Sequence, residues 1–321
     1  MCELVEKKVT IKEGVELTYI PIEGGCKITK CEIDYHKYNI TYGKFYDREG
    51  KVQYSKRTYS QGEFDKDEGK ILAQTLENFK KFTGEVLEEK DICYIHKQNK
   101  YYFQQNENYY IKCFELTIPE KIDELTVLEI GNSAFSGCKG IRELKLGDKI
   151  KKVGKYAFNG NSKLQKIDGL AEVEEIEESA FSMCGIVQMN LPNLGKIGRD
   201  AFEQCKQLTQ INCPRVEKIS GGAFFWCEKL MQINCPRTVS IGNRSFSGCK
   251  ELVQINCKSV EEIGIFAFEN CDSLKQEDCL NAKIKEAVLK NVAITTSEDS
   301  EVAKLAQKNG IPVSVHKSDN K

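Results

Sequence analysis

Hydrophobic and polar residues alternate in a short word that recurs along the second half of the chain. The word QINCPR occupies Gln210–Arg215 and Gln232–Arg237, and a near copy, QINCKS, begins at Gln254. In each copy isoleucine and cysteine alternate with glutamine and asparagine, which is the pattern of a strand with one buried face. The copies are 22 residues apart, so the pattern predicts a stack of similar units.

A second pattern, centred on phenylalanine, extends the repeat toward the N-terminus. An isoleucine or valine lies five residues before each phenylalanine, and alanine or serine lies immediately before it. A cysteine lies three residues after it, except at Asn161. The spacings between the phenylalanines are 23, 23, 21, 22, 22 and 22 residues. The seven members are Phe135, Phe158, Phe181, Phe202, Phe224, Phe246 and Phe268.

The stretch between successive strands shows a different spacing. Phe224, Cys227 and Leu230 are three residues apart, which predicts one helical or 3₁₀ turn. A strand and a short helical turn within about 22 residues are typical of leucine-rich repeats. The fold class predicted from the sequence is therefore an α/β leucine-rich repeat solenoid with a small α+β N-terminal domain.

These columns resemble the BspA-like (Treponema-type) leucine-rich repeat family. Glu115–Cys138 is similar to the family's usual first repeat, and Ser300–Val315 is similar to its usual C-terminal cap. The resemblance covers roughly 110–316. It implies a solenoid whose surface binds proteins, as in adhesins, often on or outside the cell.

The chain divides into three predicted parts. Residues 1–109 carry no copy of the repeat and predict a small α+β domain, with one helix over about Glu68–Phe82. Residues 110–280 carry the repeats. Residues 281–321 predict a C-terminal cap, which the open end of a repeat array requires.

Charge and hydropathy narrow the function classes. Lysine plus arginine (47) nearly balance aspartate plus glutamate (48), so we expect no nucleic-acid partner. No apolar run is long enough to predict a membrane span. The first residues lack the apolar core of a secretory signal, which predicts a cytoplasmic protein. The family resemblance gives a secreted or cell-surface location as the alternative, reached by a non-classical route.

The 15 cysteines allow three interpretations. Those after the phenylalanines form one column, and Cys213, Cys235, Cys257 and Cys279 form another at a strand position that earlier repeats fill with leucine. Buried free thiols are the simplest interpretation, and a ladder of disulfides is the second. A zinc site from Cys26, Cys31, Cys93 and His96 is the third.

Two sets of residues are candidates for binding. One is a pair of amide columns that face out of the strands: Gln188, Gln210, Gln232, Gln254 and Gln276, and Asn190, Asn212, Asn234 and Asn256, with Asp278 at the end. They predict a structural hydrogen-bond ladder, a face that binds an extended polypeptide or glycan, or both. The other is Phe225–Trp226, where other repeats carry mostly small or polar residues. Large exposed aromatics are frequent interface anchors, but the pair can equally pack on a neighbouring repeat.

The sequence therefore predicts a non-enzymatic monomer that binds another protein through its repeats and needs no cofactor. We find no phosphate-binding loop or catalytic nucleophile motif. The alternative is an enzymatic or metal-binding module in residues 1–109, with the repeats as its targeting arm.

Overall fold

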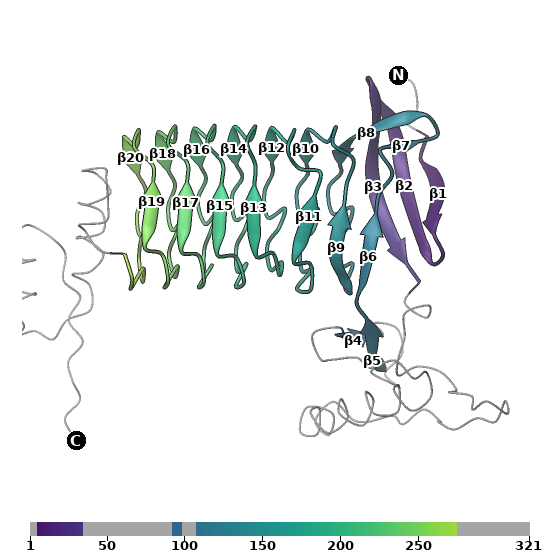
Figure 1. The fold of residues 1–321 in the computed structure, drawn as a ribbon, viewed down its shortest axis with the longest axis horizontal. Helices are drawn as coiled ribbons and strands as arrows, with labels where there is room; N and C mark the ends of the chain where they lie inside the picture. Colours follow the sequence, from purple (N-terminus) through teal and green to yellow (C-terminus); the bar gives the residue numbers. More distant parts are fainter. Residues whose placement is uncertain (1–4, 35–91, 98–106, 275–321) are drawn as a thin grey trace, which may run out of the picture.

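The computed structural model describes residues 5–34, 92–97 and 107–274. In these residues the chain forms a solenoid whose strands stack in two rows (Figure 1). We number its rungs 1 to 7 by the phenylalanines, from Phe135 to Phe268. The predicted helix over Glu68–Phe82 and the predicted cap over 281–321 lie outside the described residues.

The first row is one 11-stranded sheet in which the strands of the rungs pair in parallel. It runs in the order β1-β2-β3-β8-β10-β12-β14-β16-β18-β20, with β7 paired to β8. Its strands are β1 (Lys7–Lys12), β2 (Val15–Ile22), β3 (Gly25–Ile33), β7 (Lys121–Ile122), β8 (Leu125–Ile130), β10 (Lys152–Val153), β12 (Glu175–Ile176), β14 (Lys196–Ile197), β16 (Lys218–Ile219), β18 (Ser240–Ile241) and β20 (Glu262–Ile263).

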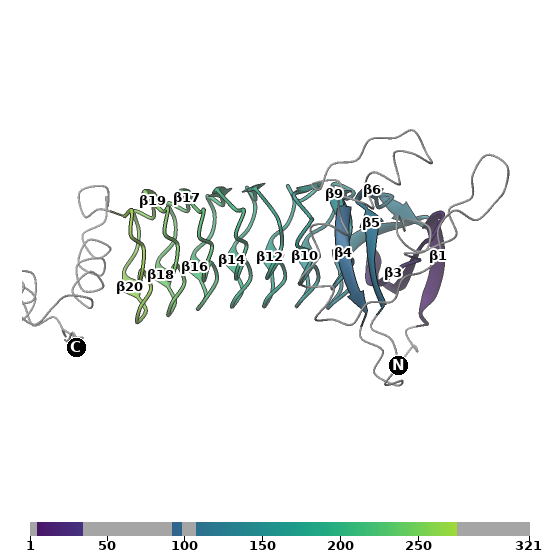
Figure 2. The ribbon, with the colours of Figure 1, turned by 90° about the horizontal axis from the view of Figure 1, so that it is seen from below.

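The second row consists of two separate parallel sheets, β11-β9-β6 and β13-β15-β17-β19. Its strands are β6 (Phe114–Thr117), β9 (Ile141–Lys145), β11 (Lys166–Asp168), β13 (Gln188–Asn190), β15 (Gln210–Asn212), β17 (Gln232–Asn234) and β19 (Gln254–Asn256). The antiparallel pair β4 (Ile92–Lys97) and β5 (Glu107–Lys112) forms a further small sheet (Figure 2).

A stack of phenylalanine rings runs through the centre of the rungs. Neighbouring ring centroids are between 5.1 and 5.4 Å apart, with interplanar angles of 1 to 16°. The seven rings are buried. The alanine or serine before each ring and the isoleucine or valine five residues before it surround the stack, so each rung buries its apolar residues against the next.

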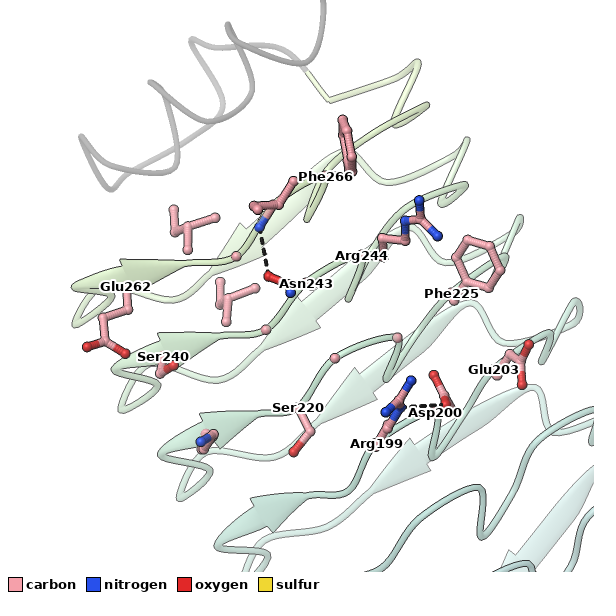
Figure 3. Close-up of a pocket in the computed structure, with 18 residues that line it drawn as sticks. Arg199, Asp200, Glu203, Ser220, Phe225, Ser240, Asn243, Arg244, Glu262 and Phe266 are labelled. Carbon is pink, nitrogen blue, oxygen red and sulfur yellow. Dashed lines mark hydrogen bonds and ion pairs between the residues drawn. The ribbon is translucent and has the colours of Figure 1, made fainter.

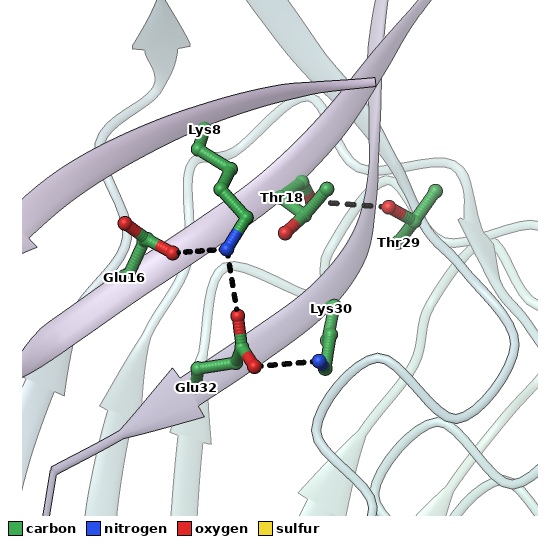
Figure 4. A network of polar contacts seen from close by, with 6 residues as sticks. All are labelled: Lys8, Glu16, Thr18, Thr29, Lys30 and Glu32. Carbon is green, nitrogen blue, oxygen red and sulfur yellow. Dashed lines mark hydrogen bonds and ion pairs between the residues drawn. The ribbon is translucent and has the colours of Figure 1, made fainter. Parts of the chain in front are cut away.

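Strands β1, β2 and β3 extend the first row beyond rung 1. β3 pairs in parallel with β8, and Leu17, Tyr19 and Ile28 join the same hydrophobic core as the rungs. Exposed ion pairs join the outer faces of the three strands: Lys8 contacts Glu16 at 2.6 Å and Glu32 at 3.1 Å (Figure 4). Exposed pairs contribute little to stability, so the buried side chains hold this segment in place.

The α/β fold class was wrong, because the described repeats are built from strands and turns and contain no helix. In rung 5 the N–H groups of Gly222, Phe224 and Trp226 donate to carbonyls of rung 6 rather than along a helix. Gly222 and Trp226 have φ of 64° and 58°, and a right-handed helix cannot contain such residues. The three-residue spacing of apolar side chains arises from consecutive turns instead. In the expected N-terminal α+β domain, the described residues 5–34, 92–97 and 107–109 form strands and turns, without a helix.

Candidate functional site

Phe225 and Trp226 lie on the turns of rung 5, directly after the buried Phe224. Trp226 is 39% exposed, and Phe225 is half-buried. Their rings meet edge to face, with centroids 6.2 Å apart. The structure therefore brings the two predicted residues together at the surface.

Trp226 also packs locally. A Cβ atom placed on Gly248 of rung 6 would come within 3.2 Å of the Trp226 ring, so that glycine leaves room for the indole. The Lys250 ammonium lies 5.3 Å from the ring centroid, a cation–π distance. Trp226 thus fits both interpretations given by the sequence, because it is partly exposed at the surface and also packs on the neighbouring rung.

The backbone shows why three of the seven rungs carry glycine at the position of Trp226. The residue two places after the core phenylalanine has positive φ in every rung, and it is glycine at positions 137, 160 and 248. Glycine adopts this conformation at no steric cost, whereas a bulky residue is strained there. The other occupants are Met183, Gln204, Trp226 and Asn270.

An open hollow of about 1010 Å³ lies beside Phe225 and spans rungs 4 to 7 (Figure 3). Gly221 and Gly222 open it, because other rungs carry larger side chains at one or both of these positions. Phe225, Arg244 and Phe266 line it, and the Arg244 guanidinium lies 5.6 Å from the Phe266 ring centroid.

The hollow carries both signs of charge. Arg199 pairs with Asp200 at 3.2 Å, and Glu203, Lys218 and Glu262 also line it. Sequence reasoning missed Arg244 and Phe266. The only signal for them is in the column two places before the core phenylalanine, where Phe266 replaces the small or polar residue of most rungs.

The two amide columns behave differently. The asparagines form the predicted ladder, with Nδ2 to Oδ1 distances of 2.7, 2.6 and 2.5 Å along Asn190, Asn212, Asn234 and Asn256. No hydrogen bond joins the four described glutamines, Gln188, Gln210, Gln232 and Gln254, which are exposed. Their amides are the free groups of this face. Gln276 and Asp278 lie outside the described residues.

The cysteines are core residues. All twelve whose side chains the structure describes are buried thiols that form no disulfide. Two of the four predicted zinc ligands, Cys26 and Cys31, lie on β3 and are buried in the hydrophobic core. The side chains of the other two, Cys93 and His96, are outside the described part of the structure. The described part of the chain contains no group of three or more potential metal ligands. Nor does that part contain a helix able to cross a membrane.

Comparison with known proteins identifies relatives of the repeats. A profile described as BspA type leucine rich repeat region (6 copies) matches residues 99–214 and 174–295. The T. pallidum leucine rich repeat protein is 28% identical in sequence, with a TM-score of 0.51, over 55% of this chain and 83% of that one. A search of curated proteins found no match.

Two further solved structures share lower identity with the chain. A leucine rich cell surface protein from Faecalibacterium prausnitzii is 20% identical, with a TM-score of 0.29, over 48% of this chain and 64% of that one. A leucine-rich repeat protein from Bacteroides ovatus is 18% identical, with a TM-score of 0.25, over 59% and 81%. The profile match covers more than half of the 321 residues, so this chain belongs to the BspA type leucine rich repeat family.

Proposed function

We propose that this protein binds another protein through its repeat surface, as a non-enzymatic recognition module, with Phe225 and Trp226 at the centre of the contact. The observation that carries the proposal is Trp226, a large aromatic residue that is 39% exposed and has φ of 58°.

The backbone of this position favours glycine. A left-handed conformation costs a residue with a Cβ atom roughly 1–2 kcal/mol. Burial of the rest of the residue can offset this cost, but 39% of Trp226 stays exposed and is available to a partner. Residues with strained backbones are concentrated at functional sites. A large, partly exposed aromatic residue in this conformation therefore favours a binding surface.

The surroundings match the composition of protein interfaces. Tryptophan, tyrosine and arginine are enriched among the residues that dominate binding energy. Arg244 and Phe266 line the hollow beside Phe225, so they extend the aromatic pair into one surface. The exposed glutamines of β13, β15, β17 and β19 form a second candidate surface, because their amides are free for a ligand.

Binding by the full chain tests the proposal. The immobilised protein is used to capture partners from an extract of the native organism, and each captured protein is then purified and titrated against variants. Phe225→Ser combined with Trp226→Gly should weaken binding by about 30-fold or more, the scale of a hot spot.

Met183→Gly is the matched control. Met183 has φ of 59° and is 46% exposed, so this variant relieves the same backbone strain two rungs away without touching Phe225. It should leave binding unchanged. Equal affinity of the double variant and the wild type, or a lowered melting temperature with unaltered binding, would contradict the proposal.

A binding function is compatible with both locations predicted from the sequence, the cytoplasm and the cell surface. Fractionation of the native cells, followed by immunoblotting, separates the two.

A further inference from the structure

The second strand row is interrupted between rungs 2 and 3. β11 is the last strand of one sheet and β13 is the first strand of the next, and they do not pair. The separation is visible in Figure 1, where β11 and β13 lie farther apart than β13 and β15. The first row continues past this point, because β10 pairs with β12.

The sequence accounts for the interruption. The spacing of the core phenylalanines changes here from 23 to 21 residues. Eight steps lead from Asp168 to Ile176, but only seven lead from Asn190 to Ile197. The chain leaves β11 through Gly169, whose φ is 92°; a Cβ atom there would lie 2.2 Å from a carbonyl oxygen of rung 1.

The interruption leaves backbone groups of β13 without their usual partners. Between regular rungs, the residue after one strand donates to the asparagine carbonyl of the next rung: Leu191 to Asn212 at 2.8 Å and Cys213 to Asn234 at 3.0 Å. Gly169 makes no such bond to Asn190. A single bond joins the two rungs near the start of these strands, from the N–H of Val187 to the carbonyl of Gln165 at 3.2 Å.

The edge of β11 that faces rung 3 also has backbone groups without hydrogen-bond partners. The Asp168 carbonyl accepts the Leu146 N–H of rung 1 at 3.0 Å. Neighbouring residues of a strand point their backbone groups to opposite sides, so the N–H and C=O of Ile167 face rung 3. No backbone hydrogen bond joins Ile167 to β13. Two strand edges therefore face each other with donors and acceptors unpaired.

A hollow of about 850 Å³ lies between these edges. Its apolar lining includes Leu170 and Met189, and Gln188 and Asn190 line it with amides. The Lys166 ammonium and the Asp168 carboxylate, which lie 2.8 Å apart, also line it, together with the Glu143 carboxylate. The hollow thus offers strand-edge hydrogen bonds and apolar contacts, with one acidic side chain in excess.

The opposite row holds the two rungs together while the hollow stays open. Besides the β10–β12 pairing, Lys152 contacts Glu175 and Glu177 at 2.9 Å each, and Lys155 contacts Glu178 at 3.2 Å. Rungs 2 and 3 are therefore held together by contacts in the first row, although their strands in the second row do not pair.

We propose that an extended polypeptide segment of a partner docks between β11 and β13 and pairs its backbone with the free groups of Ile167 and Asn190. This is β-strand addition, in which backbone hydrogen bonds give affinity and alternate side chains give specificity. A segment with small apolar residues at alternate positions and no acidic side chain fits the partly apolar lining, whose one excess charge is negative. The site is separate from Phe225 and Trp226 and does not depend on the function proposed for them.

A peptide selection tests the proposal with the full-length protein. Random dodecapeptides displayed on phage are selected on the wild type and counter-selected on Ile167→Pro, which removes one free N–H and places a ring in the hollow. Ile167→Val keeps the N–H and is the matched control. A selected peptide should bind Ile167→Val like the wild type and bind Ile167→Pro at least about tenfold more weakly.

Backbone methylation of the selected peptide makes the test independent of the folding of Ile167→Pro. N-methyl groups at alternate residues should weaken binding in either register, because successive N–H groups of the inserted strand face β11 and β13 in turn. A selection that yields no peptide distinguishing Ile167→Pro from Ile167→Val overturns the proposal. Binding that tolerates N-methylation in either register overturns it as well.

Discussion

The thiols that follow the core phenylalanines act as hydrogen-bond donors as well as apolar side chains. Cys227 donates to the carbonyl of Phe202 at 2.9 Å, and the same carbonyl accepts the Cys205 N–H at 3.1 Å. Where rung 2 lacks the cysteine, Asn161 Nδ2 donates to the Phe135 carbonyl at 2.8 Å. The column therefore requires a small buried donor, which explains why asparagine is its one exception.

Removing that donor should destabilise the protein measurably. Cys227→Ala leaves the buried Phe202 carbonyl with one partner and should lower the free energy of unfolding by about 1–3 kcal/mol. Cys227→Ser retains a donor and should lose less. Denaturant titration of both variants gives the comparison, and equal losses for serine and alanine would show that the hydrogen bond contributes nothing.

Burial also makes these thiols unreactive. It raises the pKa of Cys205 to about 12 and the pKa of Cys184 well above its ordinary value. Because the thiolate is the reactive form, alkylating reagents should label few cysteines of the rungs in the folded protein and most of them after unfolding. Mass spectrometry of labelled peptides measures this, and fast labelling of Cys205 in the folded state would contradict the burial described here.

At the scale of an element, each rung depends on both of its neighbours. Phe202 is fully buried, and its ring centroid lies 5.4 Å from that of Phe181 and 5.3 Å from that of Phe224. In an array where units contact only adjacent units, a defect in one rung weakens the two beside it.

Truncation of the central ring tests this coupling. Phe202→Ala should lower the free energy of unfolding by roughly 3–5 kcal/mol, as for other buried phenylalanines. Hydrogen exchange should accelerate most in rungs 3, 4 and 5 and least in rung 7. Unchanged exchange in rungs 3 and 5 would contradict the coupling.

The sequence predicted the period, the register and the buried faces of the strands, because each depends on side-chain hydrophobicity alone. It did not predict the turns, since apolar residues three apart fit a 3₁₀ turn as well as consecutive turns. The difference lies in the sign of φ, for which glycines such as those at 137, 160, 222 and 248 gave the signal.

The candidate site was predicted in part for a similar reason. Phe225 and Trp226 stand out because they depart from a consistent column, whereas Arg244 occupies a column with little consensus. In the sequence, the break between β11 and β13 shows as a change in the spacing of the phenylalanines. Which backbone hydrogen bonds are missing at the break depends on backbone geometry, which the sequence pattern does not give.

At the scale of the whole molecule, the N-terminal strands close one end of the stack. β3 takes the place of the rung that would precede rung 1: the Cys31 carbonyl faces the thiol of Cys138 at 3.7 Å, the position that a phenylalanine carbonyl fills elsewhere. A polar contact also ties this segment to the rungs, since the Tyr19 hydroxyl donates to the carboxylate of Asp123 in the turn between β7 and β8.

The Tyr19 contact predicts how stability changes at alkaline pH. Burial, together with the hydrogen bond to Asp123, raises the pKa of Tyr19 from 10.0 to about 12. Because the folded state holds the proton more tightly, Tyr19 contributes its full stabilisation below about pH 10, and the contribution falls as pH rises toward about 12. The ionised side chain would also face the Asp123 carboxylate, so the loss should appear first as exchange in β1, β2 and β3.

Tyr19→Phe isolates this contribution from the other 12 of the 13 tyrosines and from the lysines. The difference in unfolding free energy between the wild type and Tyr19→Phe should be constant from about pH 7 to 9 and should shift against the wild type above about pH 10. Denaturant titration of both proteins across this range measures it. A difference that stays constant up to pH values of about 12 would show that Tyr19 ionises no less readily when folded, and the closure of this end would then rest on apolar packing alone.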